Sequence, residues 1–397
     1  MSLICVLSGV LSVILLGSRT SVLCIITAAC ILFTGEVQFH KKYAYGKVIF
    51  PILSFAVLFV ALLFLKSAST SGRLFVLNRA LHLMVHSMPF GIGPGNFGKQ
   101  YMYGQADYFS KHSLFSNEAL YADDIYTANN TFIQFICETG IFGTFFLLMS
   151  IAMTAIFLRR FWKNGDILQP VSFFVVIIIL CFFSYPFYND TLRVFVLFSM
   201  AEPLRLFKSR PVVALPRPLS IMGIFVVTAG CFIFMVMDVH TQFFLLKARK
   251  RQSELVTRNS YSQAVKYDYR YVAELEFGKY LANDEASAAL PLLLKARENF
   301  PSSGLCTMIG DCYVEAKNYQ KAEEAYWCSI RMVPNRFVPK YKLFKLYVTT
   351  GDTDGAKHIA TMIRDARIKV PSPTVDEVKS IAEAYLDKNQ PSSTGDQ

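Results

Sequence analysis

Hydrophobic residues dominate the chain up to about residue 246, after which the sequence becomes polar and charged. Uninterrupted apolar runs near 48–65, 131–158 and 219–238 approach the length of about 20 residues that crosses a bilayer. The apolar segments at 1–34 and 170–203 are each interrupted by a short polar turn, so each predicts a pair of helices. The pattern therefore predicts seven membrane crossings followed by a soluble region.

The polar C-terminal region repeats with a period of 33 or 34 residues, which is typical of helix-turn-helix arrays. The recurring positions are Tyr280, Tyr313 and Tyr347; Ala289, Ala322 and Ala356; and Pro301 and Pro334. In the best copy, small residues such as Gly310 stand where paired helices approach closely, and Tyr326 fills the gap between them. This pattern resembles a tetratricopeptide repeat, with an ordinary helical hairpin as the alternative. Such arrays offer a surface for a protein partner.

We therefore expect an all-α chain, with a polytopic helical membrane domain followed by a soluble helical-repeat domain. The expected divisions are N-terminal spans with a Gly-Ser-Arg turn at 1–65, a periplasmic loop at 66–130, C-terminal spans at 131–238, a linker helix at 239–269, tetratricopeptide-like repeats at 270–370, and a terminal helix with a disordered tail at 371–397.

Lysine and arginine in short loops indicate the cytoplasmic side of a membrane protein. They gather in three loops, at Lys41, Lys42 and Lys47, at Arg159, Arg160 and Lys163, and at Arg205, Lys208, Arg210 and Arg217. This assignment places residues 66–130 and the repeat region on the opposite face. The basic cluster at 247–251 would also lie there, but it begins a long domain, and long domains cross largely regardless of charge.

Composition agrees with a membrane protein, since 53% of residues are hydrophobic and 17% are charged, against roughly 25% charged in an average soluble domain. The net charge of +11 is explained by the basic loops. The sequence has no basic recognition helix of the kind that binds nucleic acid, so we expect no nucleic-acid partner. The nine cysteines show no zinc-binding spacing. His82 and His86 share a helix face without the glutamate of a zinc protease motif, so we expect surface histidines and no metal.

Several polar residues are candidates for chemistry. Arg19 lies within apolar sequence, where a charge suggests function, although an arginine at a helix end that reaches the membrane interface is the alternative. Arg73 and Arg79 precede a glycine-rich stretch at 89–97 that predicts a tight turn at the membrane surface.

The loop at 98–130 carries tyrosines, among them Tyr126, and carboxylates, which suit a carbohydrate site but also an interfacial belt. Beyond it, Asn130, Gln134 and Glu138 are spaced by four residues and share one helix face. Three polar residues stacked at a membrane boundary predict either a packed polar contact or a lined cavity.

Four motifs in series resemble the O-antigen ligase and polymerase family over roughly residues 10–205. They are Gly-Ser-Arg at 17–19, Ser-Gly-Arg at 71–73, Pro-Phe-Gly-Ile-Gly-Pro-Gly-Asn-Phe at 89–97, and Asn-Asn-Thr-Phe-Ile-Gln with Glu-Thr-Gly-Ile-Phe-Gly at 129–143. A tetratricopeptide tail is similar to one subset of that family.

The resemblance implies metal-independent transfer of a glycan from undecaprenyl diphosphate to an acceptor hydroxyl, without a cofactor, on the periplasmic face of a bacterial inner membrane. Its expected partners are the lipid bilayer, the lipid-linked glycan and a protein at the repeats. The implied substrate-binding residues are Arg19, Arg73, Arg79, Tyr126 and Gln134, and the implied catalytic residues are Asn129, Asn130 and Glu138. Arginine suits a diphosphate because it binds phosphate with two parallel hydrogen bonds.

Two features depart from the family. Its ligases usually have a histidine where this chain has Asn129. Either another group such as Glu118, Asp123, Asp124 or His112 is the base, or this branch uses a different mechanism, or the protein is not a catalyst. The chain also begins almost at Gly-Ser-Arg, which suggests a truncated product. A non-catalytic membrane anchor that presents a repeat scaffold is therefore the competing hypothesis, and a transporter is a third. The sequence does not separate ligase from polymerase.

Overall fold

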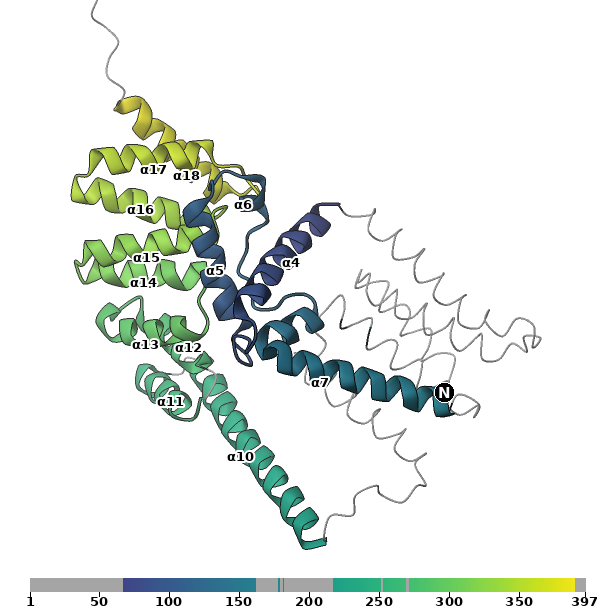
Figure 1. The fold of residues 1–397 in the computed structure, drawn as a ribbon. Helices are drawn as coiled ribbons and strands as arrows, with labels where there is room; N and C mark the ends of the chain where they lie inside the picture. Colours follow the sequence, from purple (N-terminus) through teal and green to yellow (C-terminus); the bar gives the residue numbers. More distant parts are fainter. Residues whose placement is uncertain are drawn as a thin grey trace, which may run out of the picture. The chain divides into compact units, whose positions relative to one another are not determined.

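The computed structural model describes residues 67–161, 217–250, 253–268 and 271–389, besides Ile178 and Cys181. Every regular element in these ranges is an α-helix, which confirms the expected fold class (Figure 1). The predicted spans at 1–34 and 48–65, together with Arg19 and almost all of the 170–203 segment, lie outside the described residues.

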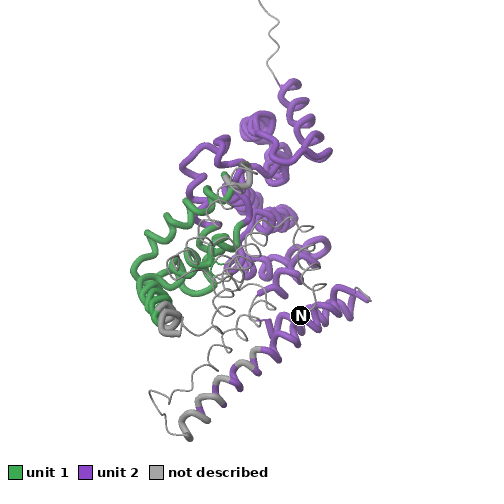
Figure 2. The backbone as a smooth tube through the Cα atoms, turned by 90° about the vertical axis from the view of Figure 1, so that its right-hand side faces the viewer, with its two compact units in different colours: residues 1–101, 125–210 green, residues 102–124, 211–397 purple. Residues whose placement is uncertain are grey.

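The chain divides into two compact units, coloured separately in Figure 2. The first contains residues 1–101 and 125–210, and the second contains residues 102–124 and 211–397. The expected periplasmic loop is therefore shared between them, because its central segment belongs to the unit that carries the repeats.

In the first unit, helix α4 (Ser67–Ser87) packs against helix α7 (Thr131–Phe161). The contact is close, because the Cys137 thiol donates to the Ala80 carbonyl across 3.4 Å and both side chains are fully buried. Helix α5 (Phe97–Lys111) begins in this unit and ends in the second.

Two described helices are long and apolar enough to cross a membrane, at the places where the sequence predicts spans. The window Thr131–Ala152 in α7 has a mean hydropathy of 1.8, and the window Thr228–Arg249 in α10 (Arg217–Arg249) has 1.6. Only 17% and 12% of these windows are buried, so their phenylalanines and aliphatic side chains face outward, as lipid contact requires.

The second unit is a row of helices in which each helix packs against the next. Its helices after α10 are α11 (Glu254–Tyr267), α12 (Val272–Leu281), α13 (Ala286–Asn299), α14 (Ser303–Glu315), α15 (Tyr319–Met332), α16 (Phe337–Thr350), α17 (Thr353–Asp365) and α18 (Pro373–Lys388). The range 239–269, expected as a linker helix, holds the end of α10 and all of α11. The segment 102–124 adds most of α5 and the short helix α6 (Asn117–Tyr121).

The helices pair as the 34-residue period predicts. Gly310 of α14 faces Tyr326 of α15, and a Cβ on this glycine would lie 2.5 Å from the tyrosine ring. The Tyr326 hydroxyl donates to Asp311 across 2.6 Å. The recurring alanines Ala289, Ala322 and Ala356 are all fully buried. This is the small-residue and aromatic packing expected of a tetratricopeptide-like pair.

Side-chain caps mark where several of these helices begin. The side-chain oxygens of Ser302, Asn318, Asp352 and Ser372 accept hydrogen bonds from backbone amides in the first turns of α14, α15, α17 and α18. Each cap of this kind stabilises the start of its helix by about 1 kcal/mol. This helps helices of 13 to 16 residues to begin directly after a short connection.

Lys340, on α16, is a buried charge within the array. Its side chain is only 2% exposed, and its ammonium donates to the Pro334 carbonyl across 2.6 Å. Burial, assisted by the nearby charge of Lys379, lowers the pKa of Lys340 to about 8.

Replacing Gly310 by alanine should destabilise the array by about 1–3 kcal/mol, because the new methyl group meets the Tyr326 ring. The matched control is Gly304→Ala in the same helix, where the nearest atom lies 4.0 Å away, and this change should be neutral or stabilising. Urea unfolding of the purified protein, followed by Trp327 fluorescence, compares the two. Equal effects of both changes would contradict the close approach.

The stability of the array should rise with pH above about pH 8, because the unfolded chain then binds a proton at Lys340 that the folded chain has released. Between about pH 7.5 and 9.5 the gain should be roughly 2 kcal/mol and should vanish in Lys340→Met. Lys345→Met, an exposed change on the same helix, should retain it. Urea unfolding at both pH values measures the difference, and an unchanged slope in Lys340→Met would contradict the assignment.

Candidate functional site

Helix α7 is broken at Gly140, and the glycine-rich turn at 89–93 fills the break. Gly140 has φ +63° and ψ −152°, so the helical hydrogen bonds across it are lost. The Ile141 amide donates instead to the Pro89 carbonyl across 2.8 Å. In return, the Cys137 and Glu138 carbonyls accept from the amides of residues 92 and 93 at 2.9 and 3.0 Å. The third and fourth motifs of the sequence therefore form one hydrogen-bonded unit.

This exchange requires glycine on both sides. A Cβ on Gly91 would lie 2.5 Å from the Glu138 carbonyl oxygen, and a Cβ on Gly140 would lie 2.2 Å from the Pro89 carbonyl oxygen. Both glycines also have positive φ, which other residues rarely adopt. The sequence predicts the turn but not its contact with the break in α7. The signal that could have indicated this contact is the glycine in each motif, Gly91 and Gly140, for which the sequence alone gives no reason.

The polar face at the start of α7 forms a packed contact. Gln134 is 8% exposed; its amide nitrogen donates to the Glu138 carboxylate across 3.1 Å, and its oxygen accepts from the Ala128 amide at 3.3 Å. Of the two alternatives for this face, the structure shows the packed polar contact. Glu138 is thereby held in one orientation.

The two asparagines before α7 shape the start of the helix. Asn129 has φ +54°, a left-handed conformation that asparagine tolerates better than most residues. Asn130 follows as the cap, and its side-chain oxygen accepts from the Ile133 amide at 3.0 Å. Both residues therefore have a structural role in addition to the catalytic role that the resemblance implies.

Of the three candidate substrate-binding arginines, the two that the structure describes differ in their surroundings. Arg73 is exposed on α4, whereas Arg79 is half-buried. Because they are six positions apart on a helix, their side chains point about 120° apart. Burial raises the pKa of the Tyr101 hydroxyl well above its usual value, and the charge of Arg79 opposes this rise.

The ends of the large loop meet beside Tyr126. A Cβ on Gly98 would lie 3.0 Å from the Tyr126 Cα atom, so the backbone before the loop touches the backbone after it. The Tyr126 side chain itself is 43% exposed. This tyrosine, Gln134, Glu138 and the two asparagines thus follow one another along a short stretch of the first unit.

The alternative bases lie in the second unit, where their carboxylates already form hydrogen bonds or ion pairs. Glu118 accepts a hydrogen bond from Tyr108. Asp123 forms an ion pair with Arg336, and Asp124 does the same. Burial would raise the pKa of Asp123, but the Asp124 amide, Lys369 and Arg336 outweigh it and hold that pKa below its usual value, so Asp123 is a weak base.

The histidines show ring contacts. His112 is exposed, and its ring stacks on Tyr108 with centroids 4.0 Å apart. His82 and His86 stack on each other at 4.1 Å along exposed positions of α4. Within the part of the chain that the structure describes, no group of three or more histidine, cysteine or acidic side chains is arranged to hold a metal.

We expect Gly140→Ala to break the contact between the turn and α7. The methyl group would lie 2.2 Å from a carbonyl oxygen at a positive φ, which should weaken the local structure by about 2–4 kcal/mol. Gly95→Ala is the control, because it shares the positive φ but opens into free space. Hydrogen exchange of the Ile92 and Gly93 amides measures the loss. Equal exchange in the two variants would show that the close approach has no importance.

Comparison with known proteins gives one family match. Residues 3–148 match the family described as O-antigen ligase. No curated protein matches the chain. Among solved structures, the crystal structure of MamA protein matches at 17% identity, covering 38% of this chain and 89% of that chain with a TM-score of 0.30. Residues 3–148 are therefore similar to the O-antigen ligases, in a chain that continues into tetratricopeptide-like helices.

Proposed function

We propose that this protein transfers a glycan from an undecaprenyl diphosphate carrier to an acceptor hydroxyl in surface polysaccharide biosynthesis, as an O-antigen ligase or polymerase. It acts as a multi-pass protein of the bacterial inner membrane, with its large loop and repeats in the periplasm. The observation that carries this proposal is the match of residues 3–148 to the O-antigen ligases. The joined turn and helix break support it, because two of the motifs behind that resemblance form one unit.

The chemistry needs a cation and a base. The acceptor oxygen attacks the anomeric carbon, the bond to the diphosphate oxygen breaks, and the lipid diphosphate leaves with the bonding electrons. Guanidinium groups stabilise the negative charge that develops on the leaving group. Arg73 suits this role because its side chain is exposed on α4, and Arg79 and Arg19 are the further candidates.

The acceptor proton requires a group other than Asn129, since an amide is not a useful base. Glu138 is the carboxylate of the motif region, and the hydrogen bond from Gln134 orients it. We assign it the role of general base. Tyr126, Asn129 and Asn130 would then bind sugar hydroxyls beside it.

A non-catalytic membrane anchor is the second candidate. The observation that favours it is the conformation of Asn129 and Asn130, which the start of α7 explains without any substrate. Under this hypothesis the repeats would present a surface for envelope assembly, and substitutions of Arg73 or Glu138 would leave that activity intact.

Complementation of cells that lack the gene separates the two candidates. Arg73→Ala and Glu138→Gln should each reduce glycan transfer by roughly 100-fold at unchanged protein level, because each removes a group that acts on the transition state. Lys111→Ala, which breaks an exposed pair with Asp107, is the control and should transfer normally. Glycan chain-length profiles are the readout. Failure of the wild-type gene to restore any glycan phenotype would favour the anchor.

A further inference from the structure

The segment 102–124 lies along the turns that connect successive helix pairs of the array. Figure 1 shows α5 and α6 beside the ends of α14, α15 and α16. Residues 102–124 and these three array helices all belong to the second unit. The segment therefore occupies a surface of the repeats that a separate partner would otherwise be expected to use.

The end of α13 and the start of α14, on either side of the first turn, contact both ends of the segment. The Tyr103 hydroxyl donates to the Arg297 carbonyl across 3.4 Å. The Ser303 amide, at the start of α14, donates to the Asp124 carboxylate across 2.9 Å. A carboxylate at this position also benefits from the positive end of the helix dipole.

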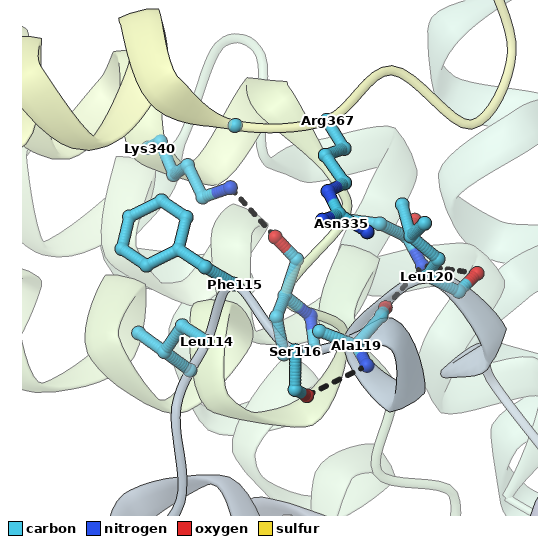
Figure 3. Close-up of a pocket in the computed structure, with 10 residues that line it drawn as sticks. Leu114, Phe115, Ser116, Ala119, Leu120, Asn335, Lys340 and Arg367 are labelled. Atoms are coloured by element: carbon cyan, nitrogen blue, oxygen red, sulfur yellow. Dashed lines mark hydrogen bonds between the residues drawn. The ribbon is translucent and has the colours of Figure 1, made fainter.

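The second turn, between α15 and α16, makes the most contacts. The buried Gln105 side chain donates to the Met332 carbonyl across 2.5 Å. Figure 3 shows Asn335 beside Ala119 and Leu120, whose carbonyls lie 3.0 and 3.4 Å from its amide nitrogen. The same nitrogen lies 2.7 Å from the Ala122 carbonyl. The two hydrogens of this amide can therefore serve the two nearest carbonyls around the end of α6, those of Ala119 and Ala122.

The charges of the segment and of the array are complementary. Arg336 lies 3.2 Å from Asp123 and 2.8 Å from Asp124, and Lys369 lies 3.5 Å from Asp123. The third turn, after α17, adds a hydrogen bond of 2.5 Å from Arg367 to Asn117. Exposed ion pairs contribute little individually, so the segment is held by the whole series, with the buried Gln105 bond among its contacts.

Both ends of the segment lead directly into the motif residues. Helix α5 is continuous from Phe97, the last residue of the glycine-rich motif, to Lys111. At the other end, Asp124 is followed closely by Tyr126 and Asn129. Because the backbone at Gly98 contacts Tyr126, a displacement of the segment would shift the backbone at both residues.

We propose that the repeat array binds its own loop, and that this intramolecular clamp positions Tyr126 and Asn129 for glycan transfer. The clamp residues Asn335 and Arg336 are positioning residues, because they act through the segment and not on the substrate. The effect on transfer rests on the proposed function, whereas the holding of the segment does not.

The test uses the full chain with the double variant Asn335→Ala and Arg336→Ala. Hydrogen exchange in 102–124 should rise at least about tenfold, while exchange within α14 and α15 stays as in the wild type. Glycan transfer should fall by at least about tenfold at unchanged protein level. Arg258→Ala is the matched control, since it breaks pairs with Glu254 and Glu285 within the array.

Arg336→Lys separates positioning from a general loss of structure, because it keeps the positive charge opposite Asp123 and Asp124. Its transfer should be much closer to that of the wild type than the transfer of the double variant. Unchanged exchange in the double variant would overturn the clamp. Increased exchange with normal transfer would overturn its positioning role. If the wild type shows no transfer, the proposed function fails and the exchange result still decides whether the array holds the loop.

Discussion

A helix that breaks near a membrane must give its freed amides and carbonyls new partners, because buried backbone groups without hydrogen bonds are costly. In α7 the break at Gly140 is tolerated since residues 89–93 supply those partners. The described helices that adjoin it in the first unit depend on this exchange. Helix α4 ends just before the turn and α5 begins just after it, so the turn that completes α7 also sets where both neighbours enter and leave.

The parts that the sequence predicts are those governed by periodic patterns. The apolar windows of α7 and α10 and the paired helices of the array follow from repeated positions such as Ala289, Ala322 and Ala356, which pack in the same way in each copy. The turn at Gly91 was also predictable, because glycines in series permit few other structures. Its partner was not, since a local pattern carries no information about which distant carbonyl will approach.

The same limit explains the acidic loop. Asp123 and Asp124 have the composition expected of a base in a carbohydrate site, and the structure uses them to bind Arg336, Lys369 and the start of α14. Asn335 and Arg336 follow Pro334 in what reads as an ordinary polar turn. The contacts of these residues are polar and follow no periodic pattern, so nothing in one segment indicates the other. Its specificity comes from several modest polar contacts aligned in space, which only the folded chain displays.

The distance along the chain between the partners of the clamp sets an order of events during biosynthesis. Arg336 is synthesised 213 residues after Asp123. At about 5–20 residues per second, a ribosome completes the loop roughly 10–40 s before the turn that receives it exists. Throughout that interval water satisfies the loop's carboxylates and carbonyls, and the family motifs on either side are unclamped. Under the proposed clamp, a nascent chain would hold its motif residues unpositioned until its last third is made and folded.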